Sequence, residues 1–271
     1  MKKVFFLLAC ILITVSLMAC AKYENTPTTC NHNYEDGICT ICQEVKPSDG
    51  LLFELNYDKK SYSIVGIGTC TDTDLIIPSI YNNLPVTTIG SYAFEDCDSL
   101  TSITIPSSVT IIDTWAFEDC DSLTSVIFEE NSKLTTIGSY AFCYCYSLTD
   151  ITIPSSVTSI GYAAFVDCES LTSITIPSSV ACILSSTFDG CYRLTNITIP
   201  RSVTSIGESA FYSCDSLNTV YYTSTKSEWN TISIGTYNSE LTDATRYYYS
   251  ETAPTTKGNY WHYVDGEIVV W

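Results

Sequence analysis

The chain has 271 residues, of which 45% are hydrophobic and only 15% are charged, and its formal net charge is −18. This acidic excess argues against nucleic acid and against an anionic lipid surface as partners. Because charged residues are scarce, the polar surface must come mainly from Ser, Thr and Asn.

Residues 1–19 have the pattern of an export signal peptide. Two lysines precede an apolar run, Val4 to Leu12, which is too short and wrongly flanked for an ordinary membrane-spanning helix. The following segment LMAC, which ends at Cys20, resembles the bacterial lipobox. That resemblance implies a lipoprotein whose first residue is a lipid-modified Cys20, with plain signal cleavage or a retained anchor as the alternative. The sequence therefore predicts export and lipid anchoring at the bacterial cell envelope.

Residues 20–29 are predicted to be a polar tether, and residues 30–47 a small Cys/His module. Zinc takes four nitrogen or sulfur ligands in a tetrahedron, and a C-x2-C pair supplies two of them from one turn. The alternative in an oxidising compartment is a disulfide between Cys39 and Cys42, or one that involves Cys70. Three cysteines and one histidine complete a zinc shell, so the pattern favours one structural, zinc-ribbon-like site. Its ligands would be Cys30, His32, Cys39 and Cys42.

A β-hairpin is predicted within residues 50–74. Two strand-like runs, 51–57 and 61–65, flank the polar turn Asp58-Lys59-Lys60. The stacked repeats that follow need their first apolar face covered, and the hairpin is expected to serve as that N-terminal cap.

Residues 75–220 repeat one template. Its opening leucine recurs at steps of 23, 25, 23, 23 and 23 residues, and one phenylalanine and one cysteine recur in the same register. The leucines are Leu100, Leu123, Leu148, Leu171, Leu194 and Leu217. The phenylalanines are Phe117, Phe142, Phe165, Phe188 and Phe211, and the cysteines are Cys120, Cys145, Cys168, Cys191 and Cys214. Self-similarity at a fixed period of this length predicts a solenoid.

Each copy combines a short strand with a turn segment. In the copy before Leu171, Gly161 is expected to permit a tight bend, and the spacing from Ala164-Phe165 to Cys168 suits one helical turn packed beneath the strand. The recurring cysteine is interpreted as a free, buried thiol, because a residue inside every coil behaves as a small hydrophobe. The core positions predicted for the next copy are Leu171, Ile174, Ile176, Val180, Ile183, Phe188 and Cys191.

The template L-x-x-I-x-I-P-x-S-V-x-x-I-G-x-x-A-F-x-x-C resembles the BspA-like (Treponema-type) leucine-rich repeat family of bacterial surface proteins. The resemblance covers about residues 75–220. It implies a leucine-rich repeat solenoid, adhesion or host-protein binding in some members, and no catalysis in the repeat itself. The chain departs from the template at Asp113, Leu184 and Thr187, and where Phe128-Glu129 with two extra residues replaces Ile-Pro. These departures predict local bulges in an otherwise regular solenoid.

Residues 221–271 are predicted to form an aromatic C-terminal cap that ends in a hairpin, because Asp265-Gly266 separates two strand-like runs. The aromatic side chains are expected to cover the last coil. The alternative is an aromatic platform for sugar rings that includes Trp261 and Tyr263, and it would make the protein a carbohydrate-binding surface protein.

Polar side chains at alternate strand positions should form rows across the outer face of the sheet. Extended solenoid sheets make broad docking surfaces. The sequence therefore predicts binding of an extracellular protein or glycan, although strand propensity and solubility alone would also account for these residues. The candidate surface consists of Ser102, Thr104, Ser125, Asp150, Thr152, Ser173, Thr175, Asn196 and Thr198.

No pattern in the sequence predicts catalysis. The chain has two histidines and lacks a G-x-S-x-G elbow, a P-loop and an H-E-x-x-H motif. Carboxylates such as Glu118 and Asp119 flank the repeat cysteines, so stacked copies would form either a solvated acidic face or a calcium site. The prediction is a non-enzymatic surface lipoprotein with no cofactor beyond the structural zinc.

Overall fold

The computed structural model describes residues 34–35, 38–39 and 46–271, and the chain divides into two units, Met1–Lys46 and Pro47–Trp271. In the first unit, β1 (Tyr34–Glu35) pairs with β2 (Ile38–Cys39) in an antiparallel hairpin. Of the predicted zinc ligands, only the backbone of Cys39 is described. The signal peptide, Cys20, the tether, Cys30, His32 and Cys42 lie outside the described residues.

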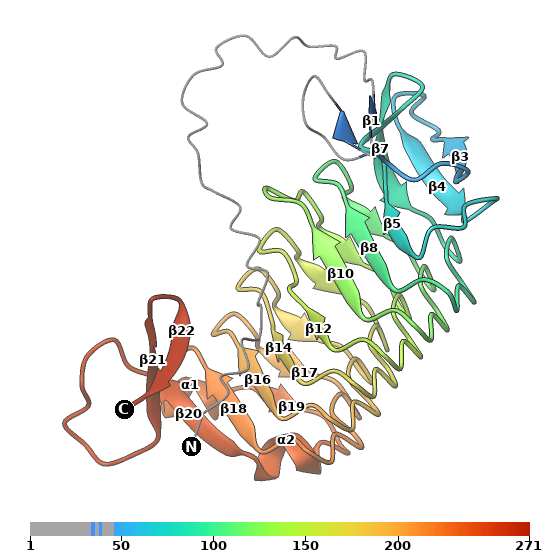
Figure 1. Cartoon of the computed structure of the whole chain (residues 1–271). Helices are drawn as coiled ribbons and strands as arrows, with labels where there is room; N and C mark the ends of the chain where they lie inside the picture. Colours follow the sequence, from blue (N-terminus) through green and yellow to red (C-terminus); the bar gives the residue numbers. More distant parts are fainter. Residues whose placement is uncertain (1–33, 36–37, 40–45) are drawn as a thin grey trace, which may run out of the picture. The chain divides into compact units, whose positions relative to one another are not determined.

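Residues 47–271 form a solenoid whose coils stack side by side (Figure 1). Each regular coil supplies one strand to a sheet that we call the front sheet and a two-residue strand to a second, the back sheet. The front strands are β5 (Asp74–Ile76), β8 (Ser102–Ile105), β10 (Ser125–Phe128), β12 (Asp150–Ile151), β14 (Ser173–Thr175), β16 (Asn196–Ile199), β18 (Thr219–Tyr222) and β20 (Thr245–Tyr249). The regular back strands are β9 (Ile111–Ile112), β11 (Thr136–Ile137), β13 (Ser159–Ile160), β15 (Cys182–Ile183), β17 (Ser205–Ile206) and β19 (Ser233–Ile234).

Both ends of the solenoid carry antiparallel hairpins, as the sequence predicts. At the N-terminal end β3 (Leu52–Leu55) pairs with β4 (Tyr62–Gly66), which continues the back sheet through β7 (Leu84–Ile89). A smaller hairpin joins β6 (Ile80–Tyr81) to β7. At the C-terminal end β21 (Tyr260–Val264) pairs with β22 (Glu267–Val270).

The solenoid continues beyond residue 220, where the sequence template ends. β20 pairs in parallel with β18, and β19 pairs in parallel with β17, so one more coil is completed. Two short helices, α1 (Lys226–Trp229) and α2 (Ser239–Asp243), take the places of turns in this coil. Coil geometry therefore survives a loss of sequence similarity.

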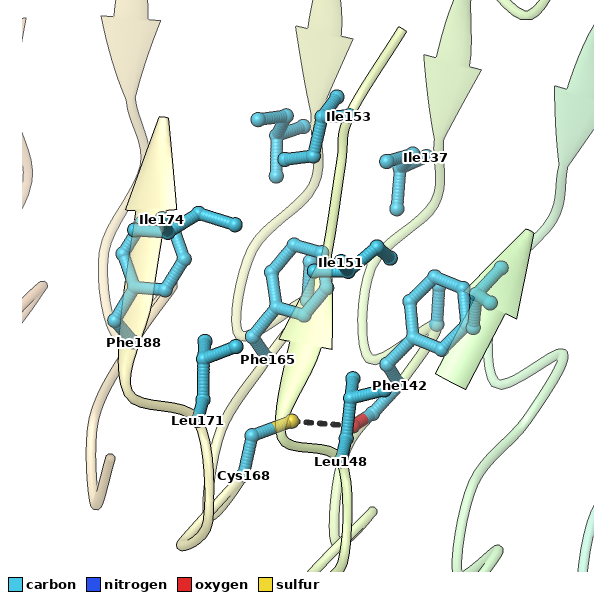
Figure 2. Close-up of a cluster of buried hydrophobic side chains, with 14 of the residues drawn as sticks. Ile137, Phe142, Leu148, Ile151, Ile153, Phe165, Cys168, Leu171, Ile174 and Phe188 are labelled. Atoms are coloured by element: carbon cyan, nitrogen blue, oxygen red, sulfur yellow. Dashed lines mark hydrogen bonds between the residues drawn. The ribbon is translucent and has the colours of Figure 1, made fainter. Parts of the chain in front are cut away.

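The core is a continuous column of side chains inside the stacked coils. The core positions predicted for the copy at Leu171 are confirmed, because each is at most 3% exposed. The repeated phenylalanines stack face to face along the column, and Phe165 lies 5.4 Å from Phe142 and 5.6 Å from Phe188 between ring centroids (Figure 2). Each coil therefore shares its apolar surface with both neighbours, which is how a solenoid is stabilised.

The prediction of a helical turn beneath each strand is wrong, because the segment is not helical. Two residues four positions apart, such as Ala163 and Asp167, have φ of 51° and 55°, which a right-handed helix does not contain. Alternate N–H groups of this segment donate to the next coil, as Phe165 does to the carbonyl of Thr187 at 2.9 Å. Hydrogen bonds between coils thus replace those that a helix would make within itself.

The glycine that recurs in the template is not needed for the tight bend that the sequence predicts. Gly161 does not take a positive φ, but a Cβ built on it would lie 2.3 Å from the backbone nitrogen of Ser139 in the preceding coil. A Cβ on Gly207 would approach Ser185 equally closely. The glycine is therefore required because adjacent backbones approach each other too closely for a side chain.

The recurring cysteines are free thiols, as predicted, and the five in register from Cys120 to Cys214 are buried. Each points back to the preceding coil and donates its S–H to a phenylalanine carbonyl, as Cys168 does to Phe142 at 3.1 Å (Figure 2). The other donors and acceptors are Cys120 to Phe94, Cys145 to Phe117, Cys191 to Phe165 and Cys214 to Phe188, at 3.1 to 3.3 Å. A weak donor thus gives an otherwise hydrophobic residue a fixed orientation.

Strand pairing is interrupted in the middle of the solenoid. Within residues 46–271, no pairing joins β12 to β14 in the front sheet or β13 to β15 in the back sheet. The two coils remain joined by the turn hydrogen bonds, by bonds from Thr172 to Thr149 and from Ser179 to Val157, and by the Phe165–Phe188 stack. This junction therefore depends more heavily on the core than the others do.

The C-terminal end of the turn ladder is closed by a side chain. The Phe211 N–H has no further regular coil to donate to, and the Asn238 side-chain oxygen accepts from it at 3.0 Å. The Asn238 amide nitrogen donates to the carbonyls of Gly207 and Gly235 at 2.9 Å. Asn238 is 3% exposed, so one buried amide takes the place of the missing coil.

Candidate functional site

The outer face of the front sheet carries the predicted polar rows. Parallel pairing places Ser102 beside Ser125 and Ser125 beside Asp150. A second row joins Ser173 to Asn196 across β14 and β16. All of these side chains are partly or fully exposed. The structure therefore brings together most of the residues that the sequence predicts to form a contact surface.

Thr198 was wrongly assigned to that surface. It lies in the row of Thr175, but it is only 3% exposed, whereas Thr175 is exposed. The next residue in the row is Tyr221, on the neighbouring strand β18. Alternation along the strand gave the correct direction for the side chain, but it could not show what lies over it.

Trp261 was also wrongly assigned. It is fully buried, its indole N–H donates to the carbonyl of Tyr222 at 3.0 Å, and its ring packs edge-on against Tyr221, Tyr249 and Tyr263. Tyr263 is 46% exposed at the margin of this cluster. The aromatic residues thus form the packed cap of the last coils, and Trp261 offers no free ring face to a sugar.

A hollow of about 600 Å³ opens on the front sheet beside β10. β10 pairs with β8 over four residues but with β12 over only two, so the two strands separate after Val126 and Ile151. The separation occurs in the copy of 25 residues, where two extra residues follow β10. That irregular spacing was the sequence signal for a local bulge, but it could not show that the bulge opens a cavity.

A second feature escaped the sequence interpretation. In the turn segments that follow the back strands, Trp115 stacks between Tyr92 and Tyr140, with distances of 5.0 and 5.2 Å between ring centroids. All three residues have φ between 55° and 60°, which is unusual for bulky side chains. Because Tyr92 and Tyr140 cover both faces of the Trp115 ring, that ring offers no free face to a ligand.

The acidic turns lie near one another, as expected from stacking. Partial burial, followed by repulsion from Asp121 and Asp96, raises the pKa of Asp119. Burial also raises the pKa of Glu118. Among the described residues, no group of three or more His, Cys, Asp or Glu side chains is arranged to hold a metal ion.

His262 lies in β21 and stacks on Trp271 with ring centroids 3.9 Å apart. Its contacts are those of the C-terminal hairpin.

In the part of the chain that the structure describes, every helix is too short or too polar to cross a membrane.

The family model of the BspA type leucine rich repeat region matches the chain in six copies, over residues 69–181 and 135–245. A leucine rich cell surface protein from Faecalibacterium prausnitzii is 33% identical with a TM-score of 0.54, and the match covers 64% of this chain and 53% of that one. A leucine-rich repeat protein from T. pallidum is 28% identical with a TM-score of 0.50, covering 64% and 90% of the two chains.

This chain therefore spans about half the length of the Faecalibacterium protein. A comparison with the curated proteins finds no match. The repeats matched by the family model make up well over half of the chain, and they coincide with the stacked coils of the structure. The chain belongs to the BspA-type leucine-rich repeat family.

Proposed function

We propose that this chain is a non-enzymatic protein of the bacterial cell surface that binds a protein partner through its front sheet. The observation that carries the proposal is the set of exposed polar rows, which parallel pairing holds in register on either side of the junction between β12 and β14. A rigid, extended face of this kind suits protein binding better than the chemistry of a small substrate. Family membership and the cell-surface relative support the same function.

The front face is tested by site-specific photo-crosslinking. With the photoreactive residue p-benzoylphenylalanine at exposed Thr175 of the front sheet, we expect a discrete crosslinked partner from the cell's surroundings. The matched control replaces exposed Ser159 in the back sheet. Thr175→Lys and Thr152→Lys should each weaken capture of that partner at least tenfold, roughly the effect of 1.4 kcal/mol, without lowering the melting temperature. Equal capture from Ser159 would contradict the proposal.

We also propose that a lipid group on Cys20 anchors the protein at the cell surface and that the N-terminal module holds one structural zinc ion. Three thiols and one imidazole are the donor set of closed zinc sites, and Cys39 ends the small β1–β2 hairpin three residues before Cys42. Cys30, His32, Cys39 and Cys42 would hold the ion, which would stabilise the fold of this module.

We expect the full chain purified from membranes to carry both the lipid group and the zinc ion. Intact-mass measurement should show a diacylglyceryl group that Cys20→Ser removes. Metal analysis should give one zinc per chain, lost in Cys39→Ser with Cys42→Ser, while Cys182→Ser serves as the control. An unmodified Cys20, or zinc retained by the double variant, would contradict the respective assignment.

A further inference from the structure

The hollow beside β10 arises from a specific distortion of the front sheet. After β10, the N–H of Glu129 donates to the carbonyl of Ile105 at 3.0 Å, and the Glu129 carboxylate accepts from the N–H of Ser107 at 2.9 Å. Both bonds hold the end of this copy against the preceding coil. The following coil pairs with β10 only up to Val126, and beyond that point the gap opens between β10 and residues 152–155.

The gap leaves part of a strand edge without a partner. On the side facing β12, pairing stops at Val126, so Ile127 and Phe128 have no partner strand there, although both pair with β8 on the other side. Unpaired N–H and C=O groups on a strand edge readily pair with an extended segment from another chain. The volume of the hollow, about 600 Å³, is enough for several residues of such a segment.

The lining of the hollow combines an apolar surface with negative charge. Ile127 is 52% exposed, and the exposed carboxylates of Glu129 and Asp150 also line the hollow. Neither carboxylate forms an ion pair with a lysine or arginine of the described chain. Lysine and arginine combine a long aliphatic stem with a cationic end, so their shape and charge match this surface.

We propose that the hollow binds an extended, basic segment of the partner protein. The backbone of the segment pairs with the edge of β10 at Ile127–Phe128, and a lysine or arginine lies over Ile127 with its charge between Glu129 and Asp150. This inference rests on the proposed function and adds the chemistry of the partner. A small free polyamine would match the charge but not the strand edge, so it is one of the competitors in the test.

The test measures fluorescence anisotropy of a labelled peptide, Thr-Lys-Val-Lys-Thr-Lys, with the full chain. The comparison ligands are a peptide with glutamate for each lysine and unlabelled spermidine as competitor. The site variant combines Asp150→Asn with Glu129→Gln, which keeps an acceptor for Ser107. The control variant makes the same change of charge at the exposed turn residues Asp121 and Glu169.

We expect the site variant to bind the basic peptide at least tenfold more weakly, the control variant to stay within about twofold, and the acidic peptide not to bind. A second variant replaces residues 127–133 with Thr-Ile-Pro-Ser-Ser, which restores a 23-residue copy. It should close the hollow and abolish binding, with a circular dichroism spectrum like that of the parent. Equal weakening by the control variant, or displacement by spermidine as effective as by unlabelled peptide, would overturn the proposal.

The result is separable from the test of the front face. If crosslinking at Thr175 captures a partner but the basic peptide does not bind, the proposed function stands and only the inference about the hollow fails. If neither occurs, both fail.

Discussion

Raising the pH from 7.5 to 10 is expected to reduce the free energy of unfolding by several kcal/mol, on the order of 6 kcal/mol or more. Burial raises the pKa of the thiols at Cys145, Cys168, Cys191 and Cys214 far above the ordinary range. In the unfolded chain these thiols ionise near pH 8.5–9, so each contributes about 1–2 kcal/mol to the difference by pH 10. This loss is comparable to the whole stability of an ordinary domain, about 5–15 kcal/mol.

The sign of the effect follows from proton binding. Above about pH 9 the unfolded chain releases thiol protons that the folded chain keeps, so rising pH favours unfolding. The contribution of the four thiols is fully present below the unfolded pKa and is lost progressively as the pH rises toward the folded pKa. Tyrosines ionise near pH 10 in an unfolded chain, so the interval from pH 8 to 10 reports mainly on cysteine.

The measurement is urea unfolding at a series of pH values. Cys168→Ala should reduce the slope of stability against pH by about 1.4 kcal/mol per pH unit above pH 9, because it removes one titrating thiol. Cys182→Ala, which changes an exposed thiol, is the control variant. A flat profile up to pH 10 in the parent protein would show that the buried thiols do not control alkaline stability.

Phe165→Ala should destabilise the protein by about 3–5 kcal/mol and also divide its unfolding into two transitions. The ring is fully buried and stacks on both Phe142 and Phe188. Its coil has no strand pairing to the next coil in either sheet, so the core column is a large part of what joins the two halves. Repeat proteins lose cooperative unfolding when a contact between neighbouring coils is weakened.

Phe117→Ala is the matched control. Phe117 is equally buried and stacks on both sides at 5.1 and 5.0 Å, but strand pairing through β8, β9, β10 and β11 is continuous around it. The control variant should lose a similar free energy of unfolding but should still unfold in a single transition. Unfolding of both variants is monitored by circular dichroism and by tryptophan fluorescence. Coincident single transitions for Phe165→Ala would show that the interrupted junction is not a weak point.

The repeat positions were predictable because period and burial are coupled in a solenoid. A side chain such as Phe188 or Cys191 recurs at a fixed step only if it occupies the same place in every coil, and the structure confirms that place as the core. The helical turn was not predictable in this way, because the choice between bonds within a segment and bonds to the next coil depends on how closely the coils stack. Gly161 carried that information, but a glycine in a sequence does not distinguish a bend from a close approach.

The candidate site was less accessible to sequence reasoning than the fold. Asp150 and Thr152 were placed correctly on the front face, because strand alternation determines which side of a sheet a residue faces. Thr198 and Trp261 were misplaced because exposure also depends on residues of other strands, which alternation within one strand does not show. The hollow depends on two coils separating, and the two extra residues after Phe128 signalled an irregularity without its shape.

The turn ladder gives the array a direction. Alternate N–H groups of each turn donate to the next coil, toward the C-terminus, whereas the repeat thiols donate toward the N-terminus, so the two ends of a stack of coils are chemically different. Gene duplication can therefore lengthen the array only by whole units in the same orientation, and neither end can be exchanged for the other. Without an end group such as Asn238, the donors at one end would suit the acceptors of another molecule. Such head-to-tail association would not close on itself, and Asn238 leaves one donor fewer for it by accepting from the Phe211 N–H.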